Sequence, residues 1–260
     1  MKVTARSTAS GLHKYGPRRL RRDRALVFRI TTDPPSDAAD RPIVLVHGIG
    51  MSHRYVSRLH DVLAADGPVF SMDLPGYGGL PKPHADVDVE KMSHGIAEMI
   101  ASLGVGPVVL VGHSMGAQWV VETGLQRPDL VSHVVVMGPV TDDEHRTLPA
   151  QMLALAVDSM REPPLVNAIV FSDYVRCGVP WYLAQVRHML AYPLEERVRA
   201  LTRPLTIIRG GRDPIAGLDW CRRVRDNARD GALVNVPGHA HVVQHSAPRA
   251  VASAIRANTA

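Results

Sequence analysis

The sequence has little of several things that mark particular classes of protein. It contains 2 cysteines in 260 residues, Cys177 and Cys221, which are too few for a disulfide framework and lack the C-x-x-C spacing of many metal sites. No run of about 18 apolar residues is present, so we expect no membrane span. The first residues, "MKVTARSTASGLHKYG", lack the apolar stretch of a secretory signal. We therefore expect reduced, structural cysteines and a cytoplasmic protein.

Positive charge is concentrated near the N-terminus. The formal net charge is +5, and residues 14–24 read "KYGPRRLRRDR". Such a cluster can contact an anionic partner. Apart from Tyr15 no aromatic residue lies within it, and no nucleic-acid motif accompanies it, so we favour a solvated basic segment over residues 1–24 and expect no nucleic-acid partner.

Short apolar runs alternate with helical patterns along most of the chain. The runs are bounded by Pro, Gly or Asp and do not alternate with polar residues, which is typical of strands buried on both faces. We predict strands over residues 25–31, 42–46, 68–73, 107–112, 133–138, 204–210 and 232–236. Helical spacing is found over residues 55–65, 115–125, 220–229 and 248–257, and in Met92, Ile96, Met99, Ile100 and Leu103 before Gly104. This order predicts an α/β fold, with a mostly parallel central sheet and helices on both faces.

The alternation is interrupted once, over residues 141–202. This stretch has no strand-like run and holds helical patterns cut by prolines. Because a structureless loop of this length is unusual in a compact domain, we predict a helical cap inserted into a core of residues 25–140 and 203–260. We expect its aromatic residues to divide between the cap's own core and a pocket; they are Phe171, Tyr174, Trp181, Tyr182 and Tyr192.

The sequence "GHSMG", residues 112–116, lies between a predicted strand and a predicted helix. This is G-x-S-x-G in a strand–turn–helix context, where a sharp turn exposes the serine hydroxyl. Gly112 and Gly116 would allow the strand and helix to approach closely. Ser114 is therefore the candidate nucleophile, and the N–H of Met115 would point toward a developing oxyanion.

Two further motifs follow predicted strands. In "HGIGMS", residues 47–52, the glycines permit close backbone approach, and the N–H of Ile49 is the expected second oxyanion donor. In "GRDP", Asp213 is the candidate acid, although a carboxylate after a strand can also cap a helix. Asp142 and Asp143 are rivals. Asp213 is favoured because another strand and a histidine-containing loop follow it, giving the chain order Ser, Asp, His.

The segments "VLVHGIGMS", "DLPGYGG", "VGHSMGAQ", "RGGRDPI" and "PGHAHVVQHSAP" together resemble the α/β-hydrolase fold superfamily, in its capped serine esterase-like branch. The resemblance extends from about Ala25 to the C-terminus, and it is specific for fold and catalytic machinery but not for substrate. Leu80 departs from it, since relatives often carry Ser there. The resemblance implies that His241, seven residues before Pro248, is the catalytic base and that His239 supports its loop. A metal site at His239 and His241 is disfavoured because no third ligand accompanies them.

These residues predict a serine hydrolase that cleaves a small-to-medium, mostly apolar carboxylic ester or related acyl compound, without a cofactor. Other chemistry on the same fold stays open: C–C bond hydrolysis, lactone or thioester hydrolysis, acyl transfer, perhydrolysis and hydroxynitrile cleavage. A ligand receptor or pseudoenzyme is the alternative from another class.

Most cap arginines should be solvated, but one of them could meet a substrate carboxylate; they are Arg146, Arg161, Arg176, Arg187, Arg197 and Arg199. The sequence leaves the oligomeric state open.

Overall fold

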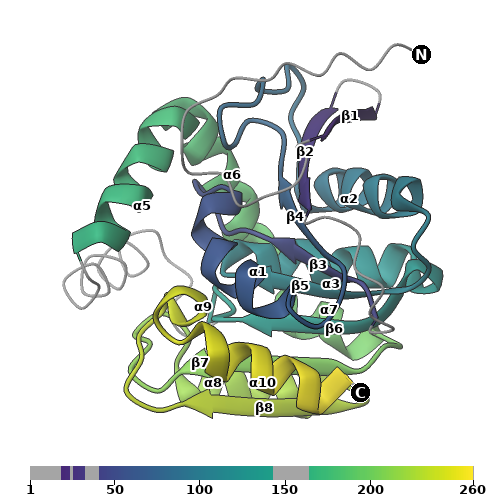
Figure 1. Cartoon of the computed structure of the whole chain (residues 1–260), viewed down its shortest axis with the longest axis vertical. Coiled ribbons are helices and arrows are strands. Elements are labelled where there is room, and N and C mark those ends of the chain that lie inside the picture. The colour runs from purple at the N-terminus through teal and green to yellow at the C-terminus, as the bar shows by residue number, and fades with distance from the viewer. Residues whose placement is uncertain (1–18, 24–25, 33–40, 143–163, 260) are drawn as a thin grey trace.

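The computed structural model describes residues 19–23, 26–32, 41–142 and 164–259 (Figure 1). The predictions on Asp143, Arg146 and Arg161 lie outside these residues. The described strands form one sheet of eight, in the order β1-β2-β4-β3-β5-β6-β7-β8. Their bounds are β1 Arg19–Asp23, β2 Leu26–Thr32, β3 Ile43–Val46, β4 Val69–Asp73, β5 Val108–His113, β6 Val131–Met137, β7 Leu205–Gly210 and β8 Gly231–Val236. Strands β3 to β8 run parallel, and β1 and β2 pair antiparallel at one edge.

The central strands are buried along nearly their whole length. Every residue of β5 and β7 is buried, and so are most residues of β3 and β6. Helices covering both faces of a parallel sheet produce this pattern, which is why these strands are continuous apolar runs in the sequence. The predicted α/β fold with a mostly parallel sheet is confirmed.

Strand β1 was not predicted. Arg19–Asp23 lies within the basic segment that we expected to be solvated, yet its backbone pairs antiparallel with β2 from Arg19 opposite Ile30 to Asp23 opposite Leu26. Charged residues are common on edge strands because only one side of such a strand is paired. The charge of "RLRRD" therefore concealed a strand that an apolar pattern could not reveal.

Helices pack on both faces of the sheet (Figure 1). Helices α2, α3, α7 and α8 pack against one another and share one apolar core, while α1 and α10 belong to a second core. The helices are α1 Ser57–Leu63, α2 Val89–Leu103, α3 Met115–Gln126, α5 Pro164–Cys177, α6 Val179–Ala191, α7 Leu194–Ala200, α8 Leu218–Asn227, α9 Val243–Ser246 and α10 Pro248–Thr259, with 3-10 turns η1 His53–Val56 and η2 Pro128–Leu130.

Local sequence explains where α2 begins and ends. Asp88 caps its first turn, with its side chain accepting a hydrogen bond from the N–H of Lys91 at 2.8 Å. Gly104 ends the helix in the left-handed region at φ 68°. A residue with a side chain rarely adopts this conformation, so the glycine after Leu103 correctly predicted the end of the helix.

Helices α5, α6 and α7 lie between β6 and β7 in the chain, and α5 and α6 project beyond one end of the sheet (Figure 1). They contact loops that follow the parallel strands. Tyr174 of α5 lies against Gly50, just after β3, and Trp181 of α6 lies against Gly76, just after β4. In the described ranges, no helix has the length and apolarity needed to cross a membrane.

Candidate active site

Ser114 occupies a strained turn between β5 and α3. Its backbone has φ 58° and ψ −123°, which is unusual for a residue with a side chain, and its N–H donates to the carbonyl of Met137 at 2.9 Å. The two flanking glycines have no room for a side chain. A Cβ on Gly112 would lie 2.3 Å from the carbonyl oxygen of Gly116, and one on Gly116 would lie 2.6 Å from that of His47. The two glycines of "GHSMG" are therefore required by this turn.

The predicted oxyanion donors lie on two segments that meet at Ser114. Met115 is the first residue of α3, where backbone N–H groups have no partner within the helix. Gly48 packs against the serine, since a Cβ added to it would lie 3.0 Å from the Cβ of Ser114. Ile49 follows directly, between Gly48 and Gly50. The segments predicted to hold an oxyanion are thus adjacent at the candidate nucleophile.

Asp213 and His241 are in direct contact. Nδ1 of His241 lies 2.9 Å from Oδ2 of Asp213, and both side chains are buried. The other oxygen of Asp213 accepts hydrogen bonds from the N–H groups of Ile215 at 2.8 Å and Ala216 at 2.9 Å. Burial by itself would raise the pKa of Asp213, but His241 and these two N–H groups outweigh it and lower the pKa. The aspartate is therefore held as a carboxylate facing the imidazole.

The rival acid has a different partner. Asp142 is paired with the guanidinium of Arg223 on α8. Asp143 lies outside the described residues. Of the two rivals and Asp213, the structure brings only Asp213 to His241 among the residues it describes.

His113 was missed by the sequence reasoning, although it is a variable position of the "GHSMG" motif. Its Nε2–H donates to the backbone carbonyl of His241 at 3.0 Å, and the two rings lie 4.7 Å apart. Burial, followed by the proximity of His241, lowers the pKa of His113 to about 3, so it is neutral. A neutral His113 supports the loop of His241 without placing a second positive charge beside it.

The ring of His241 also packs closely against backbone. A Cβ on Gly138 would lie 2.9 Å from Nδ1 and Cε1 of this ring. Gly138, at the end of β6, has φ 53°. Its lack of a side chain gives the imidazole room to lie between β6 and Asp213.

His239 lies in the same loop with other partners. Its Nδ1 is 3.0 Å from Oγ of Ser246, and its carbonyl accepts a hydrogen bond from the N–H of Arg212 at 2.8 Å. Across the part of the chain that the structure describes, no group of three or more His, Cys, Asp or Glu side chains is arranged to hold a metal ion. These contacts fit a residue that supports the loop.

A small apolar cluster lies beside the candidate base. We call it the Met51 cluster; it comprises Met51, Tyr55 and Val242, with Val170 and Tyr174 of α5 packed on them. Val242 follows His241 directly, and the ring of Tyr55 lies 5.2 Å from that of His113. The cluster thus brings α5 together with the loops that carry Ile49 and His241.

The aromatic residues of residues 141–202 have different environments. Phe171 is 71% exposed, whereas Tyr192 is buried and donates from its hydroxyl to Glu122 of α3 at 2.9 Å. Trp181 packs edge-to-face on Tyr77 of the core. Among these, Tyr174 is the one that belongs to the Met51 cluster.

The described arginines of this stretch are held by protein groups. Arg187 pairs with Asp86, Arg197 makes a bidentate pair with Glu122, and Arg199 bonds Asn227. Arg176 is half-exposed, with its Nη1 at 3.9 Å from Asp173. Arg176 lies near the "HGIGMS" loop. Of the described arginines in residues 141–202, it is therefore the one that best fits the expected contact with a substrate carboxylate.

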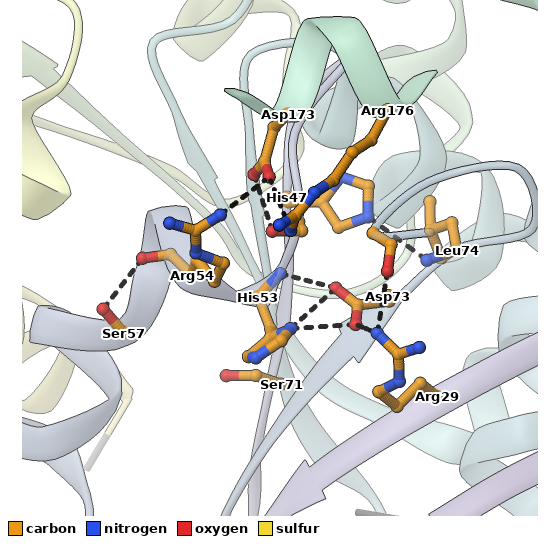
Figure 2. Close-up of polar contacts among 12 residues, drawn as sticks. Arg29, His47, His53, Arg54, Ser57, Ser71, Asp73, Leu74, Asp173 and Arg176 are labelled. Carbon is orange, nitrogen blue, oxygen red and sulfur yellow. Dashed lines mark hydrogen bonds and ion pairs between the residues drawn. The ribbon is translucent and has the colours of Figure 1, made fainter. Parts of the chain in front are cut away.

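A network of buried polar groups holds the ends of the "HGIGMS" loop (Figure 2). Asp73, at the end of β4, accepts from the backbone N–H of His53 at 2.6 Å and lies 2.8 Å from the ring of His53 and 2.9 Å from Arg29. Burial alone would raise the pKa of Asp73, but its contacts with His53 lower it. The Asp of "DLPGYGG" was noticed only as part of a motif, because its partners are distant in the sequence.

A mostly parallel sheet with a serine on its strand–helix turn, and an aspartate–histidine pair beyond later strands, is the architecture of the α/β hydrolases. The chain belongs to the alpha/beta hydrolase family, whose family model matches residues 43–254. The family and its relatives support hydrolase activity.

Among curated proteins, the chain is similar to an (E)-2-((N-methylformamido)methylene)succinate hydrolase of Acinetobacter baylyi, with 26% identity over 83% of this chain and 89% of the relative. Among solved structures, it is similar to an enol-lactonase from Burkholderia xenovorans, with a TM-score of 0.79, 17% identity and coverage of 92% and 98%. It is also similar to an E-2-(acetamidomethylene)succinate hydrolase, with a TM-score of 0.75, 21% identity and coverage of 94% of this chain and 98% of that structure. The two structures establish likeness of fold.

Proposed function

We propose that the protein is a serine hydrolase that cleaves a small-to-medium, mostly apolar carboxylic ester or related acyl compound. The hydroxyl of Ser114 attacks the acyl carbonyl, and His241 accepts its proton and delivers it to the leaving group. Asp213 orients the imidazole and stabilises its charged form. The N–H groups of Ile49 and Met115 hold the oxyanion, and water then releases the acyl group from Ser114.

The contact between His241 and Asp213 carries this proposal. With Nδ1 directed to the carboxylate at 2.9 Å, Nε2 is the ring nitrogen that would act as the base. The strained turn at Ser114 and its contact with Gly48 add the nucleophile and the oxyanion loop. These three features are set by contacts within the protein, so the proposal does not depend on which substrate is bound.

The proposal is tested with p-nitrophenyl acetate and butyrate. Wild type should release p-nitrophenol and become labelled by a fluorophosphonate at Ser114. Ser114→Ala should fold with the same circular dichroism, resist labelling and lose about 10⁴- to 10⁶-fold in kcat, because the three residues act as a unit. Labelling at another serine, or full activity of the variant, would exclude this mechanism.

A second candidate is hydrolysis of a succinate derivative like the compound in the name of the Acinetobacter relative. The similarity extends over 83% of this chain, and Arg54 and Arg176 lie half-exposed beside the "HGIGMS" loop, where they could meet a carboxylate. Ser114-dependent turnover of (E)-2-((N-methylformamido)methylene)succinate, faster than that of the uncharged esters, would favour this candidate over the first.

A further inference from the structure

The segment of residues 47–53 is fixed to the core at both ends. At the start, the buried ring of His47 donates from Nδ1 to the carbonyl of Gly48 at 2.8 Å and accepts from the N–H of Leu74 at 3.2 Å. This arrangement needs one donor and one acceptor, and burial lowers the pKa of His47, which favours the neutral ring. At the end, Asp73 holds both the N–H and the ring of His53 (Figure 2).

The second half of the same segment also contacts α5. Oγ of Ser52 donates to Oδ2 of Asp173 at 2.6 Å, a contact between residues that lie 121 positions apart. The next residue of α5, Tyr174, lies so close to Gly50 that a Cβ there would be 2.4 Å from its ring. Helix α5 therefore contacts the segment at two points, both within three residues of Ile49.

Asp173 places a buried carboxylate in the contact between α5 and residues 50–52. Its side chain is fully buried, and two guanidinium groups face its other oxygen, Arg54 at 3.4 Å and Arg176 at 3.9 Å. Burying a carboxylate is costly unless partners compensate for the lost water. Arg54 belongs to η1, directly after the loop, so a single carboxylate joins α5 to Ser52 and to η1. Figure 2 shows the contact between Asp173 and Arg54.

We propose that Asp173 is a positioning residue: it seats α5 on residues 50–52 and thereby fixes the N–H of Ile49 in the geometry of the oxyanion hole. This inference rests on the proposed function. The peptide that carries the donor, between Gly48 and Ile49, has its carbonyl held by His47 on one side and by the N–H of Met51, at 3.2 Å, on the other. Met51 lies between Gly50 and Ser52, the two residues that α5 contacts, so the second of these contacts depends on α5. An oxyanion donor must point at the transition-state oxygen within tenths of an ångström, so a relaxed loop would reduce kcat. The hole is then complete only while α5 is seated.

The test compares Asp173→Ala, Asp173→Asn and Ser52→Ala with wild type on p-nitrophenyl butyrate. Asp173→Ala and Ser52→Ala should each lower kcat by about 10- to 100-fold. This loss is no larger than the loss expected when a whole oxyanion donor is removed. KM should change by less than about threefold. The double variant should lose no more than either single variant, because both remove the same contact. Asp173→Asn keeps an acceptor for Ser52 and should restore most of the kcat.

Hydrogen exchange supplies a readout that does not depend on turnover. The amides of residues 48–53 should exchange faster in Asp173→Ala and Ser52→Ala than in wild type, while those of β5 stay unchanged. The matched control is Asp86→Ala. It removes a carboxylate that pairs with Arg187 of α6 at 2.9 Å, away from this loop, and should leave kcat and loop exchange unchanged.

Several outcomes would overturn the inference. A normal kcat in both Ala variants, a higher KM with unchanged kcat, or unchanged exchange of residues 48–53 would each exclude a positioning role. If Asp173→Ala does not fold, Ser52→Ala decides, because it removes only one hydroxyl. If wild type shows no Ser114-dependent hydrolysis, the proposed function fails and this inference with it; wild-type hydrolysis with a fully active Ser52→Ala removes this inference alone.

Discussion

Oδ2 of Asp213 lies 2.9 Å from Nδ1 of His241, whereas Asp142, the carboxylate after the preceding strand, is occupied by Arg223. Two acids at the ends of neighbouring strands thus have separate roles. Asp213→Asn should keep the shape of the site and its acceptor oxygen for Ile215 and Ala216, yet lose the charge that supports the imidazolium. We expect kcat to fall by about 10⁴-fold.

Asp142→Asn is the matched control for this variant. It removes the same charge from a nearby strand end but does not touch the partner of the imidazole, so kcat should stay within about threefold of wild type. The variant should also stay folded, since a partly exposed ion pair contributes little to stability. Initial rates at saturating substrate decide the comparison. A fully active Asp213→Asn beside an inactive Asp142→Asn would assign the acid to the end of β6.

His239 and His241 should differ sharply in their contribution to catalysis. The ring of His241 faces Asp213, while that of His239 faces Ser246. His241→Ala should lose about 10⁴- to 10⁶-fold in kcat. His239→Ala should lose only a few-fold, because it loosens a loop contact and removes no proton acceptor. Both are measured at a temperature where each variant is folded. An inactive His239→Ala with a near-normal His241→Ala would mean that the base lies two residues earlier.

The local motifs could be predicted from the sequence, whereas the contacts that hold them together could not. The turn at Ser114 needs Gly112 and Gly116 within five consecutive residues, so its geometry is visible in "GHSMG". Asp173 and Ser52 carry no such pattern, because what joins them is the packing of α5 on a loop that precedes it by 121 residues. Similarly, β1 is paired through its backbone, which a pattern of side chains does not report.

His113 should make the stability of the fold depend on pH. Its pKa falls from 6.5 to about 3 on folding, so the unfolded chain binds more protons in this range. The contribution of the neutral His113 ring to folding stability is fully present above pH 6.5, and it is lost as the pH falls toward 3. Other buried histidines add to the slope in wild type. His113→Gln should reduce the slope of unfolding free energy against pH by up to about 1.4 kcal/mol per pH unit between pH 6 and 4.

This slope is measured by urea unfolding at a series of pH values. His94→Gln, on the exposed face of α2, is the control and should leave the slope as in wild type. A His113→Gln variant whose slope equals that of wild type would show that His113 is not buried as a neutral ring. A uniform loss of stability at all pH values would report lost packing alone.

The substrate's acyl chain should be short to medium in length. The Met51 cluster places apolar side chains beside His241, and Val170 and Tyr174 pack α5 against them, so we expect a limited length to fit. We expect kcat/KM to rise by roughly fourfold for each methylene that gains apolar contact, since burying one contributes about 0.8 kcal/mol, and then to fall for longer chains. The measurement is kcat/KM for p-nitrophenyl esters from acetyl to palmitoyl. Val170→Phe should shift the optimum to a shorter chain, whereas Val179→Phe, at a position 70% exposed, should not. A maximum at palmitoyl, or a jump in activity on emulsified substrate, would contradict the limited length and indicate a lipase.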